Sequence, residues 1–484
     1  MTSNPDTRPV LLWLRADLRL VDNPALSWAV ESGRPVIPVF VLDDAGCGRI
    51  GAASRWWLHG SLQALGNALE RKGSRLILHR GSTLETLTAL VRETRACAVT
   101  WNRLYDAHRV TEGRKLRAWC KRTGVESRDF NASLLFEPQD IRTAGGLPYR
   151  IFTPFWRRCQ EKGFKRLPSA APDRIPAGPW PESERLEDWK LRPRNLDWSA
   201  GFHRVWHPGE EGARMRLKCF LLQDLRNYHT ERDHPGKPAT SRLSPHLHFG
   251  EIGPHQITAL LNSVDPGPGP DAYLRELGWR EFSRHLLFHN PDMESFGLRP
   301  EFERMPWRQD PAGLERWQQG LTGYPLVDAG MRELWTTGWM HNRVRMVTAS
   351  FLTKHLLIDW RLGAEWFLDT LVDADRASNS AGWQWVAGCG SDAAPYFRIF
   401  NPVAQSQRFD PAGQYLRTWL PELQQLPDRF IHVPWQAPQR MLTDAGVRLG
   451  ENYPYPMVDH AFARKRALEI YRTRIRSGTH SPPA

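Results

Sequence analysis

The stretch from Thr337 to Pro402 combines residue types that rarely occur together in buried segments. It holds indoles, carboxamides, carboxylates and arginines, yet its apolar spacing predicts buried helices. Burying so many polar groups costs free energy unless each finds a partner. A large polar ligand in this region would supply partners. The stretch therefore predicts a ligand site, and its chemistry-bearing residues include Asn342, Arg343, Trp360, Asp373, Asp375, Asn379, Trp383, Trp385 and Arg398.

A second polar cluster occupies residues 240–244, just before a helix-rich region. Its hydroxyls belong to Thr240, Ser241 and Ser244, and Arg242 adds a guanidinium. Hydroxyls and backbone N–H groups at a helix start can hold a diphosphate without a glycine-rich loop. Helix capping or a Ser/Thr turn explains the same residues equally well. The residues alone leave both interpretations open.

An acid and an aromatic residue share one face of a predicted helix. Glu276 precedes Trp279 by about one helical turn, so both side chains project from the same face. A carboxyl group beside an aromatic platform can hold and protonate a stacked base. A core tryptophan beside a surface ion pair is the plainer interpretation of this segment in isolation.

Other motifs carry weaker signals. Residues 46–51 match G-x-G-x-x-G, but they follow the second predicted strand rather than the first, which favours a coincidental glycine-rich loop over a nucleotide site. His246 and His248 lack the acidic or cysteine neighbours that would complete a metal shell, so packing or loop histidines are favoured. The six cysteines are widely spaced and form no C-x-x-C pair. We therefore expect no metal site and no disulfide framework.

Composition limits the class of protein. The chain has 484 residues, of which 41% are hydrophobic and 24% charged, typical of a globular protein. Its formal charge of +12 favours polyanionic partners. No apolar run approaches the ~18 residues needed to span a bilayer, and residues 1–9 resemble no signal peptide, so a cytoplasmic location is expected. The 22 tryptophans exceed what core filling readily explains.

The first third alternates between apolar strands and helical patterns. Strands are predicted over residues 10–14, 36–42, 75–78, 97–101 and 125–130, with helices between them, which indicates a parallel sheet. Residues 132–205 are rich in proline and predict an extended linker. Helical patterns dominate afterwards, including one predicted helix over 341–354. The predicted organisation is an α/β domain (1–131) with a five-stranded parallel sheet, a linker (132–205) and an all-α domain (206–484).

The segments 240–244, 279–282, 337–346 and 379–402 closely resemble motifs of the DNA photolyase/cryptochrome family, and the resemblance extends over nearly the whole chain. It implies a Rossmann-like N-terminal domain and a helical domain that binds FAD. The residues that match the family's FAD contacts are Tyr228, Thr240, Ser241, Arg242, Leu243, Ser244, Arg280, Arg345, Asp373, Asp375 and Asn379.

The resemblance also implies redox roles. Asn379 matches the position that faces flavin N5, where similar plant cryptochromes carry an acid and animal ones a thiol. An amide there favours repair over signalling. Trp383, Trp360 and Trp307 match the family's three-indole electron chain from flavin to surface.

The resemblance further implies a substrate. Enzymes that repair (6-4) photoproducts place two histidines where Asn342 and Met346 stand, whereas Glu276, Asn342 and Met346 match enzymes that split cyclobutane pyrimidine dimers. Glu276 would hydrogen-bond the dimer, which would be flipped out of the duplex into a pocket. The residues expected to contact DNA are Arg232, Trp279, Arg343, Trp385 and Arg398.

The resemblance leaves several alternatives open. Tyr273 stands where the family usually has tryptophan, and Arg275 replaces an amide. Residues 105–109 lack the Asn-Glu pair that holds a folate in some relatives, so a folate antenna, a deazaflavin antenna or none remains possible. We expect light-driven repair of pyrimidine dimers by a monomer. The alternatives are a cryptochrome-type blue-light photoreceptor and a flavin protein that binds DNA without catalysis.

Overall fold

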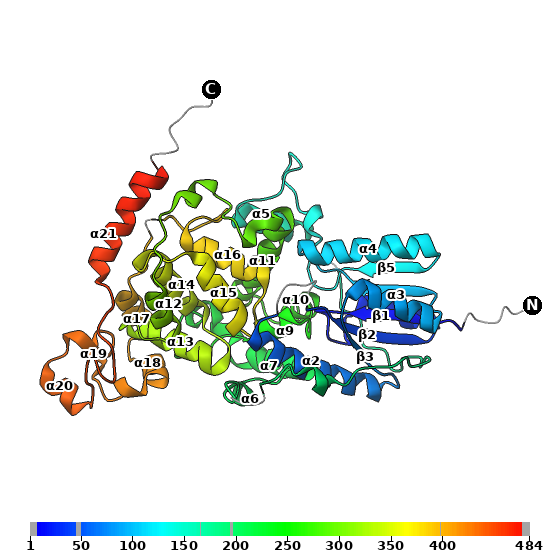
Figure 1. Cartoon of the computed structure of the whole chain (residues 1–484), viewed down its shortest axis with the longest axis horizontal. Coiled ribbons are helices and arrows are strands. Elements are labelled where there is room, and N and C mark those ends of the chain that lie inside the picture. The colour runs from blue at the N-terminus through cyan, green and yellow to red at the C-terminus, as the bar shows by residue number, and fades with distance from the viewer. Residues whose placement is uncertain (1–6, 45–49, 165, 194–196, 397, 477–484) are drawn as a thin grey trace, which may run out of the picture. The chain divides into compact units, whose positions relative to one another are not determined.

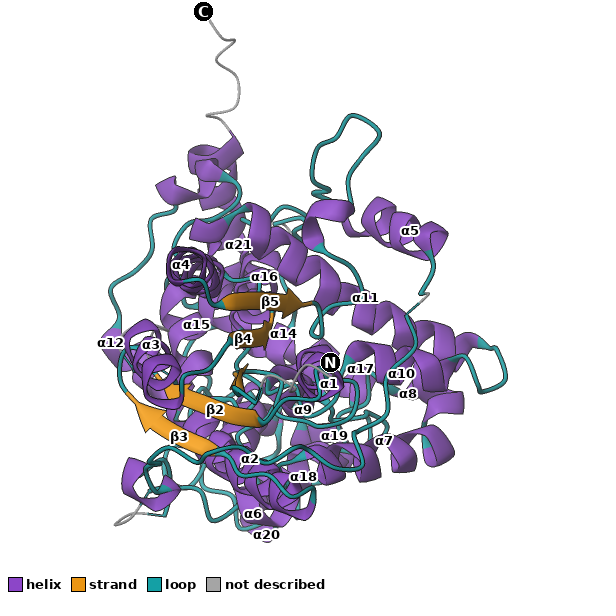
Figure 2. Cartoon of the chain, turned by 90° about the vertical axis from the view of Figure 1, so that its right-hand side faces the viewer, coloured by secondary structure: helices purple, strands orange, loops and turns teal. Residues whose placement is uncertain are grey.

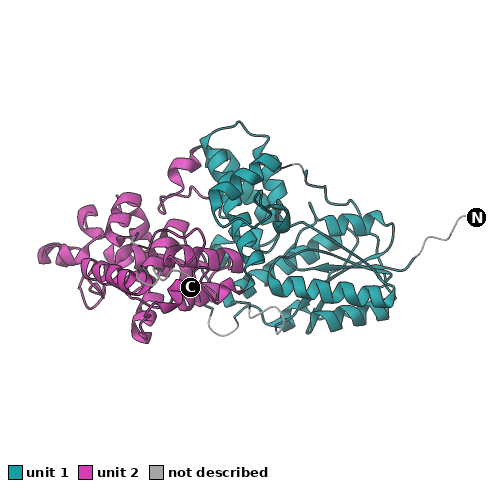
Figure 3. Ribbon diagram, turned by 90° about the horizontal axis from the view of Figure 1, so that it is seen from above, with its two compact units in different colours: residues 1–226, 241–291 teal, residues 227–240, 292–484 magenta. Residues whose placement is uncertain are grey.

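The computed structural model describes residues 7–44, 50–164, 166–193, 197–396 and 398–476. The chain forms two compact units, distinguished by colour in Figure 3. Unit 1 comprises residues 1–226 and 241–291, and unit 2 comprises residues 227–240 and 292–484. The predicted linker segment, 132–205, lies in unit 1, and the predicted helical segment, 206–484, contributes to both units.

Unit 1 contains the predicted five-stranded parallel sheet, with strand order β3-β2-β1-β4-β5 (Figure 1). Its strands are β1 (Val10–Leu14), β2 (Val36–Leu42), β3 (Ile77–Arg80), β4 (Ala98–Asn102) and β5 (Glu126–Phe130). Strands β1, β2 and β4 are buried along their whole length, which explains their unbroken apolar runs. Strand β5 at the edge carries charged residues, which discourages pairing with other chains.

Helices cover this sheet (Figure 2). They are α1 (Pro24–Glu31), α2 (Ala52–Arg71), α3 (Thr83–Thr94) and α4 (Ala107–Thr123). Alternate strand residues, such as Leu11 with Trp13 and Ile37 with Val39, pack with α3 and α4 into one apolar core. The predicted α/β class of this region is therefore confirmed.

The remaining helices of unit 1 are α5 (Phe152–Lys162), α6 (Phe202–Val205), α7 (Glu210–Gln223), α9 (Ser244–His248), α10 (Pro254–Leu261) and α11 (Pro268–His289). The fully buried Glu251 carboxylate accepts hydrogen bonds from the Trp57 indole (3.0 Å) and the Gly209 amide (2.7 Å). His246 contacts the same carboxylate through Nδ1. His246 therefore packs α9 into the unit, in agreement with the packing interpretation.

Unit 2 is helical. Its helices are α8 (Tyr228–Glu231), α12 (Pro311–Gln318), α13 (Pro325–Thr337), α14 (Asn342–Ser350), α15 (Trp360–Thr370), α16 (Arg376–Ala387), α17 (Pro402–Phe409), α18 (Gln414–Trp419), α19 (Asp428–Ile431), α20 (Gln439–Asp444) and α21 (His460–Ile470). The single helix predicted over 341–354 is wrong in one respect: α14 ends at Ser350, and a π-helical turn (Phe351–His355) follows it. Leu357 then adopts a left-handed conformation with φ 57° and redirects the chain toward α15.

Within the described ranges, no helix is long and apolar enough to cross a membrane. The same residues contain no group of three His, Cys, Asp or Glu side chains that could hold a metal ion. Residues 46–49 of the glycine-rich loop lie outside the described ranges.

Candidate active site

In unit 1, the hydroxyl cluster of residues 241–244 is fixed by α11. The buried Tyr273 hydroxyl donates to Ser241 Oγ at 3.1 Å, and burial raises the pKa of the Tyr273 phenol to about 12. Because Ser241 Oγ accepts from Tyr273, its own proton can point to another acceptor. Arg242 takes the left-handed conformation with φ 48°, and Ser244 opens α9. Tyr273, which departs from the family pattern, thus positions the predicted diphosphate loop.

Helix α11 also carries the predicted acid and its aromatic neighbour. Glu276 and Trp279 are both half-buried and lie three residues apart on the helix. The Trp279 ring stacks on Phe152 of α5, with centroids 3.7 Å apart and planes inclined by 8°. This stacking holds the indole in one orientation, so α11 presents a fixed aromatic surface beside a carboxyl group.

Arg280 makes contacts inside unit 1. Its Nη1 donates to the Ser133 carbonyl at 2.9 Å and to Glu281 at 3.1 Å. Burial raises the pKa of the Glu281 carboxyl to about 7, although Arg280 and the Leu135 amide favour its charged form. These contacts show Arg280 supporting a buried acid. Its role in binding flavin stays a prediction.

In unit 2, the loop between α15 and α16 carries two predicted carboxylates. Arg345 donates to both oxygens of the nearly buried Asp373, at 2.9 and 3.1 Å, and its Nε donates to the Met340 carbonyl at 2.7 Å. Asp375 caps α16 by accepting from the Ser378 amide at 2.8 Å. The contacts of Arg345 Nη2 and Nε fix the guanidinium in place, and the Asp375 cap holds the other end of the loop.

Asn379 on α16 has a defined amide orientation. Its Nδ2 donates to the Ala364 carbonyl of α15 at 3.0 Å. A flipped amide would place two oxygens against each other, so this hydrogen bond assigns the nitrogen and leaves Oδ1 as an acceptor. The Asn379 oxygen can therefore accept a hydrogen bond from an N–H group of a ligand.

The three predicted redox tryptophans all lie in unit 2. Trp383 on α16 and Trp360 at the start of α15 are buried at 3% and 2% exposure, and Trp307 is half-buried. The Arg308 amide donates to the Leu357 carbonyl at 2.7 Å, which brings the segment after Trp307 alongside the turn that leads into Trp360. Trp307 is therefore the most exposed of the three indoles, as the outer end of a route from interior to solvent requires.

Gly363 allows Trp383 to pack against α15. A Cβ atom at this position would lie 2.1 Å from the Trp383 ring. We expect Gly363→Ala to lower the free energy of unfolding by ~1–3 kcal/mol, since overpacking forces neighbours to move. Thermal unfolding measures the change. Gly382→Ala in α16 is the matched control, because a Cβ there meets nothing within 4 Å, and equal destabilisation of both variants would contradict the expectation.

The predicted DNA-contacting arginines of unit 2 have different surroundings. Arg343 pairs with Asp233 at 2.7 Å and lies 4.5 Å from the centre of the Phe409 ring. Arg232 lies 5.2 Å from the centre of the buried Tyr228 ring, so both predicted residues meet here. Arg398 is exposed, and no ion pair engages its guanidinium within the part of the chain that the structure describes.

Helix α14 presents two further predicted residues. Asn342 is exposed at its first position and Met346 is half-buried one turn later, so they share a face. His341 instead caps the helix, with Nδ1 accepting from the Arg343 amide at 3.2 Å. Trp385 on α16 is half-buried against the apolar core of unit 2.

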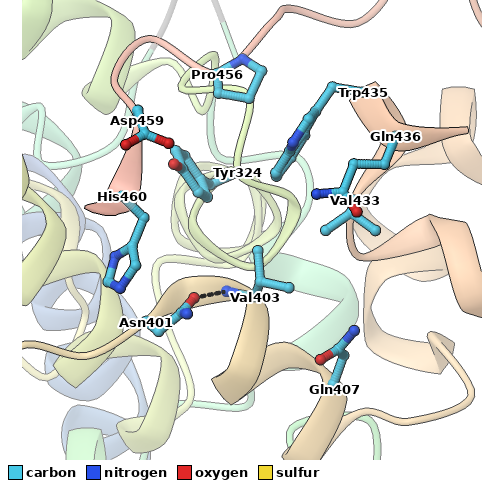
Figure 4. Close-up of a pocket in the computed structure, with 10 residues that line it drawn as sticks. All are labelled: Tyr324, Asn401, Val403, Gln407, Val433, Trp435, Gln436, Pro456, Asp459 and His460. Carbon is cyan, nitrogen blue, oxygen red and sulfur yellow. Dashed lines mark hydrogen bonds between the residues drawn. The ribbon is translucent and has the colours of Figure 1, made fainter. Parts of the chain in front are cut away.

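A cavity of about 490 Å³ also lies in unit 2 (Figure 4). Tyr324, Trp435 and His460 form part of its wall, and Asn401 uses its side chain to cap α17 through the Val403 amide at 3.0 Å. None of the predicted cofactor or DNA residues lines it. The predicted site residues are therefore grouped elsewhere, in two sets, one in each unit.

Two family models match this chain. The family model described as the FAD binding domain of DNA photolyase matches residues 273–473, and the model described as DNA photolyase matches residues 10–174. The chain is 48% identical over 469 residues to a deoxyribodipyrimidine photo-lyase of Agrobacterium fabrum, covering 96% of this chain and 98% of the relative. It is 38% identical to cryptochrome-1 of Arabidopsis thaliana, over 94% of this chain and 69% of that protein.

A solved structure is also similar. A bacterial class III photolyase from Agrobacterium tumefaciens superimposes with a TM-score of 0.95 at 47% identity, covering 98% of each chain.

Proposed function

Because the chain belongs to the DNA photolyase/cryptochrome family, we propose that it splits cyclobutane pyrimidine dimers in DNA using light. The near full-length similarity to a deoxyribodipyrimidine photo-lyase carries this conclusion. The uncommitted amide oxygen of Asn379 and the Glu276 and Trp279 surface of α11 are consistent with it.

FAD is the cofactor, and the residues present fit it. The hydroxyls of 240–244 suit its diphosphate, Arg345 and Asp373 suit the polar edge of its ring system, and Asn379 offers an acceptor oxygen. When bound and reduced, FAD supplies on absorbing light the electron that cleaves the dimer.

Asn379 Oδ1 is proposed to hold the proton at flavin N5. Its amide cannot rotate freely because Nδ2 is bonded to Ala364. An acid at this position could give up its own proton to the ring, whereas an amide does not. This difference favours an enzyme that keeps its cofactor ready for electron donation.

We propose that the following side chains hold the lesion. Glu276 hydrogen-bonds the base edge of the flipped dimer, and Trp279 and Trp385 form apolar walls. Asn342 and Met346 present a polar and an apolar contact from one face of α14. Arg232, Arg343 and Arg398 bind phosphates, which positions the DNA without reading its sequence. Since one chain carries all of these residues, we propose that it acts as a monomer.

The three tryptophans are proposed to return an oxidised cofactor to its reduced form. Trp383, Trp360 and Trp307 are proposed to pass an electron inward when the cofactor is oxidised, with Trp307 as the solvent-side donor. Indoles are readily oxidised, and burial keeps the first two away from competing reactions.

The second candidate is a blue-light photoreceptor, favoured by the 38% identity to a plant cryptochrome. Blue-light turnover of an oligonucleotide with one thymine dimer separates the two. We expect repair in light and none in darkness, and no repair of a matched (6-4) oligonucleotide. Light-driven cofactor reduction without dimer repair would instead favour the photoreceptor.

A further inference from the structure

The Lys354 side chain of unit 2 is buried and has no part in the proposed reaction. Lys354 is 1% exposed and lies in the π-helical turn Phe351–His355. Among the residues that the structure describes, no carboxylate forms an ion pair with its ammonium group. A buried charge without a partner is costly in free energy. The groups that accept hydrogen bonds from Lys354 therefore indicate what the lysine does.

The partners of Lys354 are backbone carbonyls of a single segment. Nζ donates to the Tyr396 carbonyl at 3.2 Å and to the Arg398 carbonyl at 3.1 Å. It also lies 5.0 Å from the centre of the Tyr396 ring, within reach of a cation–π interaction. The same ring stacks on Tyr471, with centroids 4.7 Å apart. One ammonium group therefore holds two backbone carbonyls, those of Tyr396 and Arg398.

The segment that Lys354 holds ends in an exposed arginine. Arg398 has its carbonyl bonded to the buried lysine, while its side chain reaches solvent. Its amide donates to the Pro395 carbonyl at 2.8 Å, so its backbone is fixed through both its amide and its carbonyl. A phosphate-binding side chain gains affinity when its backbone is already ordered before binding.

We propose that Lys354 is a positioning residue for DNA binding: by holding the Tyr396 and Arg398 carbonyls, it fixes the backbone that presents the Arg398 side chain to a DNA phosphate. This inference rests on the proposed function, which assigns Arg398 to DNA. Lys354 itself would not touch DNA and would act only through Arg398.

The strength of the Lys354 hydrogen bonds is expected to depend on pH. Burial lowers the pKa of Lys354 to about 7, so the ammonium form predominates below that pH and the neutral amine above it. A neutral amine can still donate, but charge-assisted hydrogen bonds are roughly twice as strong as neutral ones. The hydrogen bonds from Lys354 to the Tyr396 and Arg398 carbonyls, here called the anchor, are therefore strongest below about pH 7.

The groups facing Lys354 do not titrate in this range. Burial raises the pKa of the Cys389 thiol to about 12 and also raises the pKa of the Tyr396 phenol. Burial lowers the pKa of the adjacent His355 to about 3, and Arg466 donates to the His355 carbonyl. A change in DNA affinity near pH 7 that depends on Arg398 is therefore assigned to Lys354.

Binding of a duplex with one thymine dimer, measured in darkness by fluorescence anisotropy on the FAD-loaded protein, tests the inference. We expect Arg398→Ala to raise Kd about tenfold, the scale of one lost charge-assisted contact. Lys354→Met, which keeps the length of the side chain and removes its donors, is expected to raise Kd about fivefold.

The double variant is expected to bind no more weakly than Arg398→Ala alone, since the effects of coupled residues are not additive. Lys121→Met on α4 is the matched control for loss of a positive charge.

Additive losses in the double variant, or wild-type binding by Lys354→Met, would overturn the inference. If Lys354→Met fails to fold, the wild type and Arg398→Ala are compared between pH 6 and 8.5. A weakening of the wild type by about threefold that is absent in Arg398→Ala supports the anchor, and parallel profiles overturn it. Failure of the wild type to prefer damaged DNA would instead reject the proposed function.

Discussion

Replacing Glu276 with alanine is expected to slow dimer splitting by about a hundredfold while FAD remains bound, the scale seen when one preorganised polar contact to a developing charge is removed. Glu276 lies on the same face of α11 as Trp279, whose ring is held by Phe152. The carboxyl group would meet the lesion in a fixed position, so its loss removes stabilisation from the charged dimer rather than from the protein. Turnover of a thymine-dimer oligonucleotide under saturating light measures the effect.

The control for this variant is Asp271→Asn, which removes an exposed carboxylate in the first turn of the same helix. It is expected to repair at the wild-type rate, and the absorption of bound FAD is expected to be equal in both variants. Wild-type repair by Glu276→Ala would reject the assigned role of this acid.

Replacing Trp383 with phenylalanine is expected to abolish photoreduction of the oxidised cofactor but to spare repair by enzyme reduced beforehand. Phenylalanine is much harder to oxidise than indole, so the inner step of the route is lost. Illumination with an external reductant, followed by absorption, measures the loss.

Trp317→Phe is the matched control. Trp317 is fully buried and meets Trp383 edge-on at 6.2 Å, but its indole donates to the Thr348 carbonyl at 3.1 Å and lies outside the proposed route. Both substitutions are expected to cost ~2 kcal/mol of stability as buried volume is lost. Photoreduction that survives in Trp383→Phe and disappears in Trp317→Phe would require a different route.

The sheet could be predicted because its buried strands are continuous apolar runs. The predicted ends of strands were less accurate. The strand predicted over 75–78 is Ile77–Arg80 in the structure, because β3 pairs only with β2 and its pairing starts with Ile77 opposite Val39. Helix ends showed the same limit at Ser350, where a π-helical turn replaces the predicted continuation.

The candidate site shows a similar division. Residue types suggested Glu276, and the family resemblance suggested Asn379 and the three tryptophans; their roles stay predictions. Lys354 escaped notice because lysine is normally exposed, and only two carbonyls from a distant segment make its burial possible. Such a partnership is created by folding and leaves no pattern in the local sequence.

The missing side chain at Gly363 has a consequence for how the protein responds to temperature. Because Gly363 has no side chain, the Trp383 ring packs directly against the backbone of α15 and has no room to move closer to that helix. On the proposed indole route, this spacing is set when the chain folds rather than reached by thermal fluctuation. If the proposed route operates, charge separation at this step would therefore persist in a frozen glass, where slower motions of the chain have stopped.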